Sequence, residues 1–151
     1  MANCRKIKGR LPVIPLLKRL EEALGGERLR NDHDLVRVVE ARLPLTALEA
    51  LRSAGLTDDE IYSLVLPRRT LSHRVSKGER LSRDESDRVV RILRIITFGE
   101  RLFHEPDRFW RWFRSPMRRI DSRSPLEMLQ TEAGARVVEE LLIGLDEGFV
   151  A

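Results

Sequence analysis

The segment from Leu66 to Arg94 is strongly basic and could bind the phosphates of a nucleic acid. It carries nine Lys or Arg residues against four Asp or Glu residues. This local excess says more about a ligand than the net charge of +4 for the whole chain. An Arg side chain can donate two hydrogen bonds to guanine, whereas Lys and Ser mostly bind the backbone and fix the register. The pattern therefore makes DNA the first ligand to consider.

The elements that would position these side chains are a helix, a tight turn at residues 64–67 and a second helix. Pro67 can begin the second helix, and Gly78 ends it after Lys77. If Leu71 and Val75 face inward, the polar side chains face outward, and the N-terminus of the helix would enter the major groove as in a helix-turn-helix. The residues expected to contact DNA are Arg68, Arg69, Thr70, Ser72, His73, Arg74 and Lys77.

The longest expected helix, residues 83–103, follows this motif and could join two copies of the chain. Its apolar residues cover more than one face, so it is either central to the core or shared with a second copy. A single helix-turn-helix covers little DNA, so we expect a homodimer that binds two half-sites of operator DNA. The alternative for the basic face is simple solvation, in which case the chain is an interaction module that does not bind DNA.

The chain lacks the patterns of an enzyme. His33, His73 and His104 are dispersed and have no Cys or His neighbours at the spacing of metal ligands. There is no Gly-rich phosphate loop, nucleophile elbow or zinc-protease motif. The acidic cluster at residues 58–60 is explained by helix capping and by the helix dipole. We therefore expect no enzymatic activity, no metal and no cofactor.

The cellular compartment is expected to be the cytoplasm. Cys4 is the only cysteine, so an internal disulfide is impossible, as is usual in a reducing compartment. The basic start of the chain has no apolar core like that of a signal peptide. No apolar run approaches the roughly 20 residues that span a bilayer. We therefore expect no membrane association.

The hydrophobic pattern predicts an all-α fold. Helices are expected after Pro15, over residues 45–53, 68–77 and 83–103, and after Pro106. Residues 34–43 are ambiguous between helix and strand, but nothing else in the chain could pair with a strand. Capping boxes begin at Thr57, Ser82 and Ser124, and Thr131 is expected to cap the last helix.

The last third of the chain is expected to be a separate unit. Four aromatic residues, Phe109, Trp110, Trp112 and Phe113, are expected to form its small core and not to stack on bases. The predicted division is residues 1–42 (a basic arm and helices without an assigned role), 43–104 (helix-turn-helix and dimerisation) and 105–151.

The chain ends in a short apolar segment after the amphipathic last helix. Glu147, Gly148, Phe149, Val150 and Ala151 form this end. Either Phe149 and Val150 fold back onto their own core, or they insert into a pocket of a partner protein.

Two blocks of residues resemble the Xre/MbcA/ParS family of antitoxins and cover about two-thirds of the chain. The first block is similar to the family's Xre-like helix-turn-helix and comprises residues 66–74, 77–79 and 81–88. The second is similar to its toxin-binding domain and comprises residues 112–116, 124–129, 131–135 and 147–151. Met117 and Ser122 depart from the family's Asn and Gly, and we expect an altered loop on an unchanged fold.

The resemblance implies an antitoxin for a RES-domain toxin, a class of toxin that resembles ADP-ribosyltransferases and depletes NAD. It implies that the C-terminal residues 147–151 cover the active site of the toxin, with Phe149 as an anchor and the carboxylate of Ala151 meeting arginines of the toxin. It also implies repression of the chain's own operon. The alternative is a stand-alone dimeric helix-turn-helix transcription regulator without a toxin partner.

Overall fold

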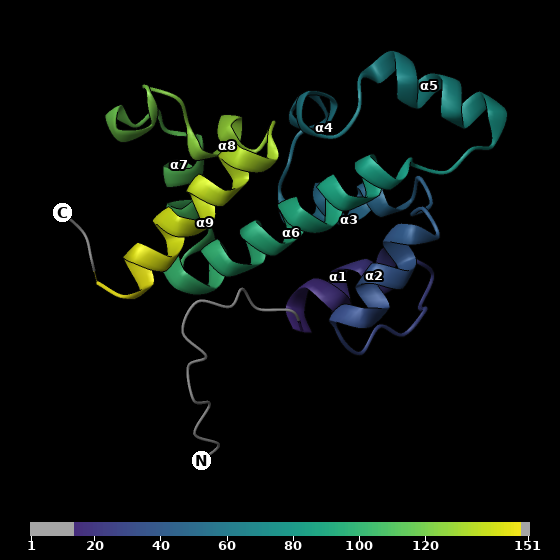
Figure 1. Cartoon of the computed structure of the whole chain (residues 1–151), viewed down its shortest axis with the longest axis horizontal. Helices are drawn as coiled ribbons and strands as arrows, with labels where there is room; N and C mark the ends of the chain where they lie inside the picture. The colour runs from purple at the N-terminus through teal and green to yellow at the C-terminus, as the bar shows by residue number, and fades with distance from the viewer. Residues whose placement is uncertain (1–13, 149–151) are drawn as a thin grey trace.

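The computed structural model describes residues 14–148, and within this range the chain is all-α, as predicted. Most helices are arranged along α6, with α5 near one end of the molecule and α7 and the end of α9 near the other (Figure 1). The helical elements of this range are α1 (Ile14–Ala23), α2 (Asp32–Glu40), α3 (Ala47–Ala54), α4 (Asp58–Leu64), α5 (Arg68–Lys77), α6 (Arg83–Phe103), α7 (Pro106–Arg114), the 3-10 helix η1 (Arg118–Ile120), α8 (Pro125–Met128) and α9 (Glu132–Asp146).

Helix α6 is the centre of the core, and α1, α2, α3, α7 and α9 pack against it. Its side chains Val89, Ile92, Leu93, Ile95 and Ile96 have no exposed surface in the single chain. A helix that is apolar on several faces must be covered on all of them. The sequence left open whether α6 lies in the core or joins two copies, and the structure shows that its own chain covers it.

The local sequence signals place most helix ends correctly. Each of the three predicted capping boxes is present, at Thr57 before α4, Ser82 before α6 and Ser124 before α8. The side chain of Thr131 accepts a hydrogen bond from the N–H of Gly134 and so caps α9, as predicted. These caps satisfy backbone N–H groups that the first turn of a helix leaves unpaired.

The ambiguous segment at residues 34–43 contains most of helix α2. The helix begins at Asp32, because the side chain of Asn31 accepts a hydrogen bond from the N–H of Asp34. Leu35 and Val38 face the core, whereas Val36 is exposed. The β-branched residues are therefore accommodated in a helix, as expected from the lack of a partner strand.

The aromatic residues of α7 belong to the core, as predicted, but they do not form a core of their own. Phe109 and Phe113 are fully buried, their ring centroids lie 4.8 Å apart, and both belong to the same hydrophobic cluster as residues of α1 and α9. Gly99 of α6 lets the ring of Phe109 come close, since a Cβ atom there would lie 2.1 Å from the ring. Helices on both sides of residue 104 thus share one core, and the three-part division of the chain stays a prediction.

Candidate functional site

Helices α4 and α5 and the short turn between them form the expected helix-turn-helix. Val65 and Leu66 anchor the turn in the core, and Pro67 directly precedes α5. Helix α5 lies at one end of the molecule and has no fully buried side chain. Leu71 packs partly against the core, but Val75 is 62% exposed. The prediction that Val75 faces inward is therefore wrong, because no other helix covers that side of α5.

Arg74 connects α5 to the start of α6. Its guanidinium lies 3.3 Å from a carboxylate oxygen of Glu79 and 3.1 Å from one of Glu85, and it also donates a hydrogen bond to the carbonyl of Arg80. The side chain of Arg74 is only 16% exposed and that of Glu85 only 11%. Glu85 also closes the capping box at Ser82. The ion pair therefore ties α5 to the N-terminus of the central helix.

The other predicted DNA-contacting residues are more accessible. Arg68, Arg69, His73 and Lys77 are exposed and form no ion pair with any residue in the range 14–148. Ser72 is exposed and donates to the carbonyl of Arg68, and Thr70 is half-buried. The side chains of Arg68, Arg69, His73 and Lys77 can therefore donate hydrogen bonds to a ligand, whereas the guanidinium of Arg74 is already bound within the chain.

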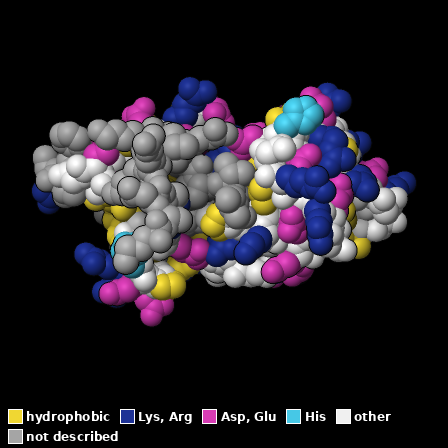
Figure 2. Space-filling view, turned by 90° about the horizontal axis from the view of Figure 1, so that it is seen from below, with side chains coloured by type: hydrophobic (Ala, Val, Ile, Leu, Met, Phe, Trp, Pro, Cys, Tyr) yellow, Lys and Arg dark blue, Asp and Glu magenta, His cyan; other side chains and the backbone are white. Residues whose placement is uncertain are grey.

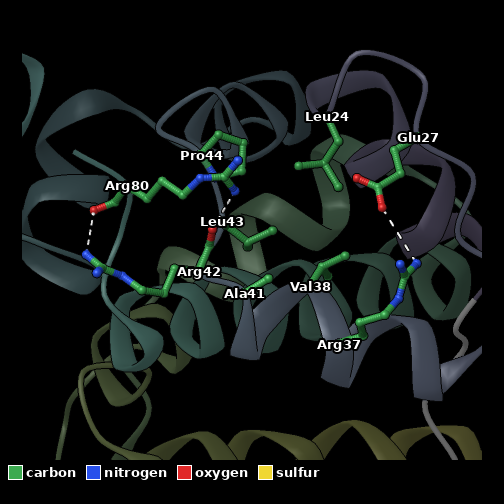
Figure 3. Close-up of a pocket in the computed structure, with 9 residues that line it drawn as sticks. All are labelled: Leu24, Glu27, Arg37, Val38, Ala41, Arg42, Leu43, Pro44 and Arg80. Carbon is green, nitrogen blue, oxygen red and sulfur yellow. Dashed lines mark hydrogen bonds and ion pairs between the residues drawn. The ribbon is translucent and has the colours of Figure 1, made fainter. Parts of the chain in front are cut away.

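Two arginines clasp the loop between α5 and α6 to the loop between α2 and α3 (Figure 3). Arg42 donates to the carbonyls of Leu81 (2.9 Å) and Arg80, and Arg80 donates to the carbonyl of Arg42 (2.9 Å). Arg42 has a left-handed backbone, with φ of +67°. A hydrogen bond between the backbones of Leu81 and Leu43 completes the clasp. No sequence signal indicated it, because its acceptors are backbone carbonyls from distant loops.

The clasp borders a cavity of about 210 Å³ between α2 and these loops. Leu24, Val38 and Pro44 provide apolar side chains, and Arg37 with Glu27 lies at its rim (Figure 3).

In the space-filling view, Lys and Arg side chains gather on one half of the face seen from below and are interspersed with acidic ones (Figure 2). This face therefore has no continuous positively charged patch.

The C-terminal helices end at the opposite side of the molecule from α5 (Figure 1). Glu147 and Gly148 follow α9 and are exposed. Phe149, Val150 and Ala151 lie outside the described residues. Glu147 and Gly148, the described part of the predicted partner-binding segment, thus lie far from the helix-turn-helix.

Arg114 of α7 links the C-terminal helices to the helix-turn-helix. Its guanidinium lies 2.7 Å and 2.9 Å from the two carboxylate oxygens of Glu60 in α4, donates to the carbonyl of Gly55, and lies 4.4 Å from the ring centroid of Trp110. Glu60 also accepts the N–H of Thr57, so one carboxylate both caps α4 and binds α7. From its position in the sequence, Glu60 is expected only to cap α4.

The electrostatics at this link favour the ionised pair. Burial alone would raise the pKa of Glu60, but the hydrogen bonds from Arg114 and Thr57, together with the charge of Arg114, outweigh it and lower that pKa. The hydrogen bond to Glu60 raises the pKa of Arg114. Bidentate Arg–carboxylate pairs are among the stronger polar contacts in proteins. This pair therefore fixes the position of α7 against α4.

Residues 14–148 contain neither a metal-binding cluster nor a helix that could span a membrane. No group of three or more His, Cys, Asp or Glu residues there could hold a metal ion. No helix in the same range is long and apolar enough to cross a membrane.

Comparison with known protein families assigns both halves of the chain. Residues 34–94 match the antitoxin Xre-like helix-turn-helix domain, and residues 98–148 match the antitoxin Xre/MbcA/ParS C-terminal toxin-binding domain. The fold and these matches define a helix-turn-helix protein with a toxin-binding domain.

Relatives along most of the chain agree with these matches. A Pseudomonas putida protein named antitoxin Xre is 30% identical over 131 residues, which are 87% of this chain and 82% of the relative. A Yersinia enterocolitica protein of the same name is 27% identical over 116 residues, 76% of this chain and 72% of the relative. The chain belongs to the Xre antitoxin family. As a member of this family it acts by binding and is not an enzyme.

Proposed function

We propose that this chain is a cytoplasmic antitoxin that neutralises a RES-domain toxin with its C-terminal segment and represses its own operon through the helix-turn-helix. The observation that carries the proposal is the separation of two exposed ends. Helix α5 lies at one end of the molecule, and the end of α9 lies at the other (Figure 1). One chain can therefore bind DNA and a protein partner at the same time without competition between them.

For DNA, the accessible side chains of α5 are the proposed contacts. Arg68 and Arg69 begin the helix, where the N-terminus of a recognition helix meets base edges and phosphates. Thr70, Ser72, His73 and Lys77 are proposed to complete the contact surface. Arg74 is also proposed to contact DNA, and its ion pairs favour an additional role in holding α5 in place.

Two half-sites require two copies of the chain, so we propose that a homodimer binds the operator. The apolar side chains of α6 are buried within one chain and leave no apolar seam for a second copy. Contacts elsewhere on the surface, or the DNA itself, would have to hold the two copies together.

For the toxin, the proposed contacts are the last five residues. Glu147 and Gly148 are exposed beyond α9 and lead to Phe149, Val150 and Ala151. The apolar side chain of Phe149 suits a concave, mostly apolar cleft such as one that binds NAD. Occupation of that cleft would exclude NAD, the ligand implied by the resemblance to antitoxins of RES-domain toxins.

The toxin proposal is tested by capture from native host cells. The bait is the full chain, and the comparison is a chain that ends at Asp146. We expect only the full chain to retain a stoichiometric partner that consumes NAD once freed. A point variant, Phe149→Asp, keeps the length and should bind far less of this partner. Capture of the same partner by all three baits would overturn the tail mechanism, and capture of no partner would leave a stand-alone regulator.

The DNA proposal is tested by titration of the region upstream of the chain's own gene. The variant is Arg68→Ala with Arg69→Ala, and the control is Arg101→Ala with Arg136→Ala, which removes equal charge from exposed sites outside α5. We expect the first variant alone to lose affinity. Since each phosphate contact contributes about 0.9, its salt slope should fall by about 2 for each chain, or about 4 for the proposed homodimer. Equal losses of DNA affinity in both variants would refute the proposal that α5 is the DNA-binding helix.

A further inference from the structure

A second strongly basic stretch of the chain lies outside the helix-turn-helix. Residues 108–123, here called the arginine segment, contain six Arg residues and a single acidic residue, Asp121. Arg114 pairs with Glu60, and the other five are Arg108, Arg111, Arg118, Arg119 and Arg123. Of these five, Arg123 donates a hydrogen bond to the carbonyl of Glu127 (2.8 Å). The segment falls within the matched toxin-binding domain.

These five arginines are exposed, and none forms an ion pair with a residue in the range 14–148. Arg19, Arg52 and Arg91, on other helices, differ in that each pairs with a carboxylate. A cluster of exposed like charges creates a local potential that attracts ligands of the opposite charge. The pattern therefore points to an acidic ligand.

The backbone holds much of the arginine segment in a fixed shape. The N–H of Met117 donates to the carbonyl of Arg123 (2.9 Å), and the N–H of Ser122 donates to the carbonyl of Met117 (3.0 Å). Ile120, which follows the exposed Arg118 and Arg119, is buried and anchors η1. The arginines of the loop are therefore presented from a preorganised scaffold, which reduces the entropy lost on binding.

The structure favours an acidic protein surface over a nucleic acid. Single-stranded nucleic acids bind through aromatic rings that stack on bases, but Phe109 and Phe113 are buried in the core. The segment also lies toward the end of the molecule opposite α5, where α9 leads to the proposed toxin-binding residues (Figure 1). Duplex DNA held by α5 would lie at the other end.

We propose that the arginine segment binds an acidic patch on the toxin beside the cleft that the C-terminal residues occupy. The proposal rests on the proposed antitoxin function and extends it with a second, electrostatic contact. Long-range attraction of this kind accelerates association and weakens as salt rises, whereas the buried tail would govern dissociation.

The test is the association rate constant of the captured, purified NAD-consuming toxin at low and high salt. Arg118→Glu with Arg119→Glu should slow association about tenfold or more at low salt, within the range known for electrostatic steering, and leave dissociation nearly unchanged. The control, Arg28→Glu with Arg30→Glu, reverses the same charge at exposed sites outside the toxin-binding domain and should associate as the unmodified chain does.

Equal association rates for the two variants would overturn the arginine proposal and leave the tail mechanism standing. A selective loss of operator affinity in the Arg118/Arg119 variant would also overturn it and identify a nucleic-acid surface. If the unmodified chain binds no toxin, the antitoxin proposal fails, and the arginine proposal fails with it.

Discussion

The ion pair between Arg114 and Glu60 should couple the toxin-binding helices to the helix-turn-helix by a measurable free energy. Exposed pairs contribute about 0.2–1 kcal/mol, and removing one partner of a fully buried pair costs about 3–5 kcal/mol. The side chains here are 39% and 20% exposed, between those limits. We expect Arg114→Ala to lower the free energy of unfolding by about 2 kcal/mol, because three charge-assisted hydrogen bonds are lost.

The measurement is a double-mutant cycle with Arg114→Ala and Glu60→Gln, followed by urea unfolding. Both tryptophans of the chain lie on α7, and Trp110 contacts the Arg114 guanidinium, so intrinsic fluorescence reports on this region directly. We expect a coupling energy of about 1 kcal/mol. The pair Arg52–Asp58 is the control, since it lies on the surface with its carboxylate 57% exposed and should couple by less than about 0.5 kcal/mol.

The pH dependence of this coupling follows from the lowered pKa of Glu60. A carboxyl group whose pKa is lower in the folded state stabilises the fold fully above its unfolded pKa. That stabilisation disappears as the pH falls through the folded pKa. The coupling should therefore persist at neutral pH and vanish in acid. A coupling energy of zero at pH 7, or one that does not change in acid, would refute the assignment of this pair as the link.

Three further changes have defined outcomes. Gly99→Ala should destabilise the chain by about 2–4 kcal/mol in urea unfolding, because its Cβ would meet the ring of Phe109, and Phe109→Leu should relieve part of that loss. Ser122→Gly should raise the melting temperature, corresponding to about 0.5–1 kcal/mol, since Ser122 has a φ of +58° that glycine adopts without strain. Burial raises the pKa of Glu139, so its charge destabilises the fold above its unfolded pKa, and Glu139→Gln should raise stability at pH 7 but not in acid.

The sequence predicted the helices well because their ends depend on local chemistry. Thr57, Ser82 and Ser124 each satisfy backbone donors three residues away, so residue type and spacing suffice. The bounds of α5 follow in the same way from Pro67 and Gly78. The glycine that the resemblance leads one to expect at residue 122 would also have a local cause, because Ser122 lies in the left-handed region.

The candidate site was predicted less completely because its geometry depends on distant residues. Val75 has the spacing of a core residue, yet it is exposed because nothing packs over that side of α5. Arg74 resembles its basic neighbours in sequence, and only the folded chain brings it to Glu85. Gly99 did carry a local signal, since a glycine inside a helix is unfavourable unless another group must come close.

The most direct test of the central claim is one experiment with two readouts in cells that carry the toxin gene and a reporter under the chain's own promoter. We predict that a chain ending at Asp146 still represses the reporter but fails to rescue growth. We predict the reverse for Arg68→Ala with Arg69→Ala, which should rescue growth but lose repression. If each variant loses both activities, or if the truncated chain still rescues growth, then toxin neutralisation and DNA binding do not reside at the two ends of this molecule.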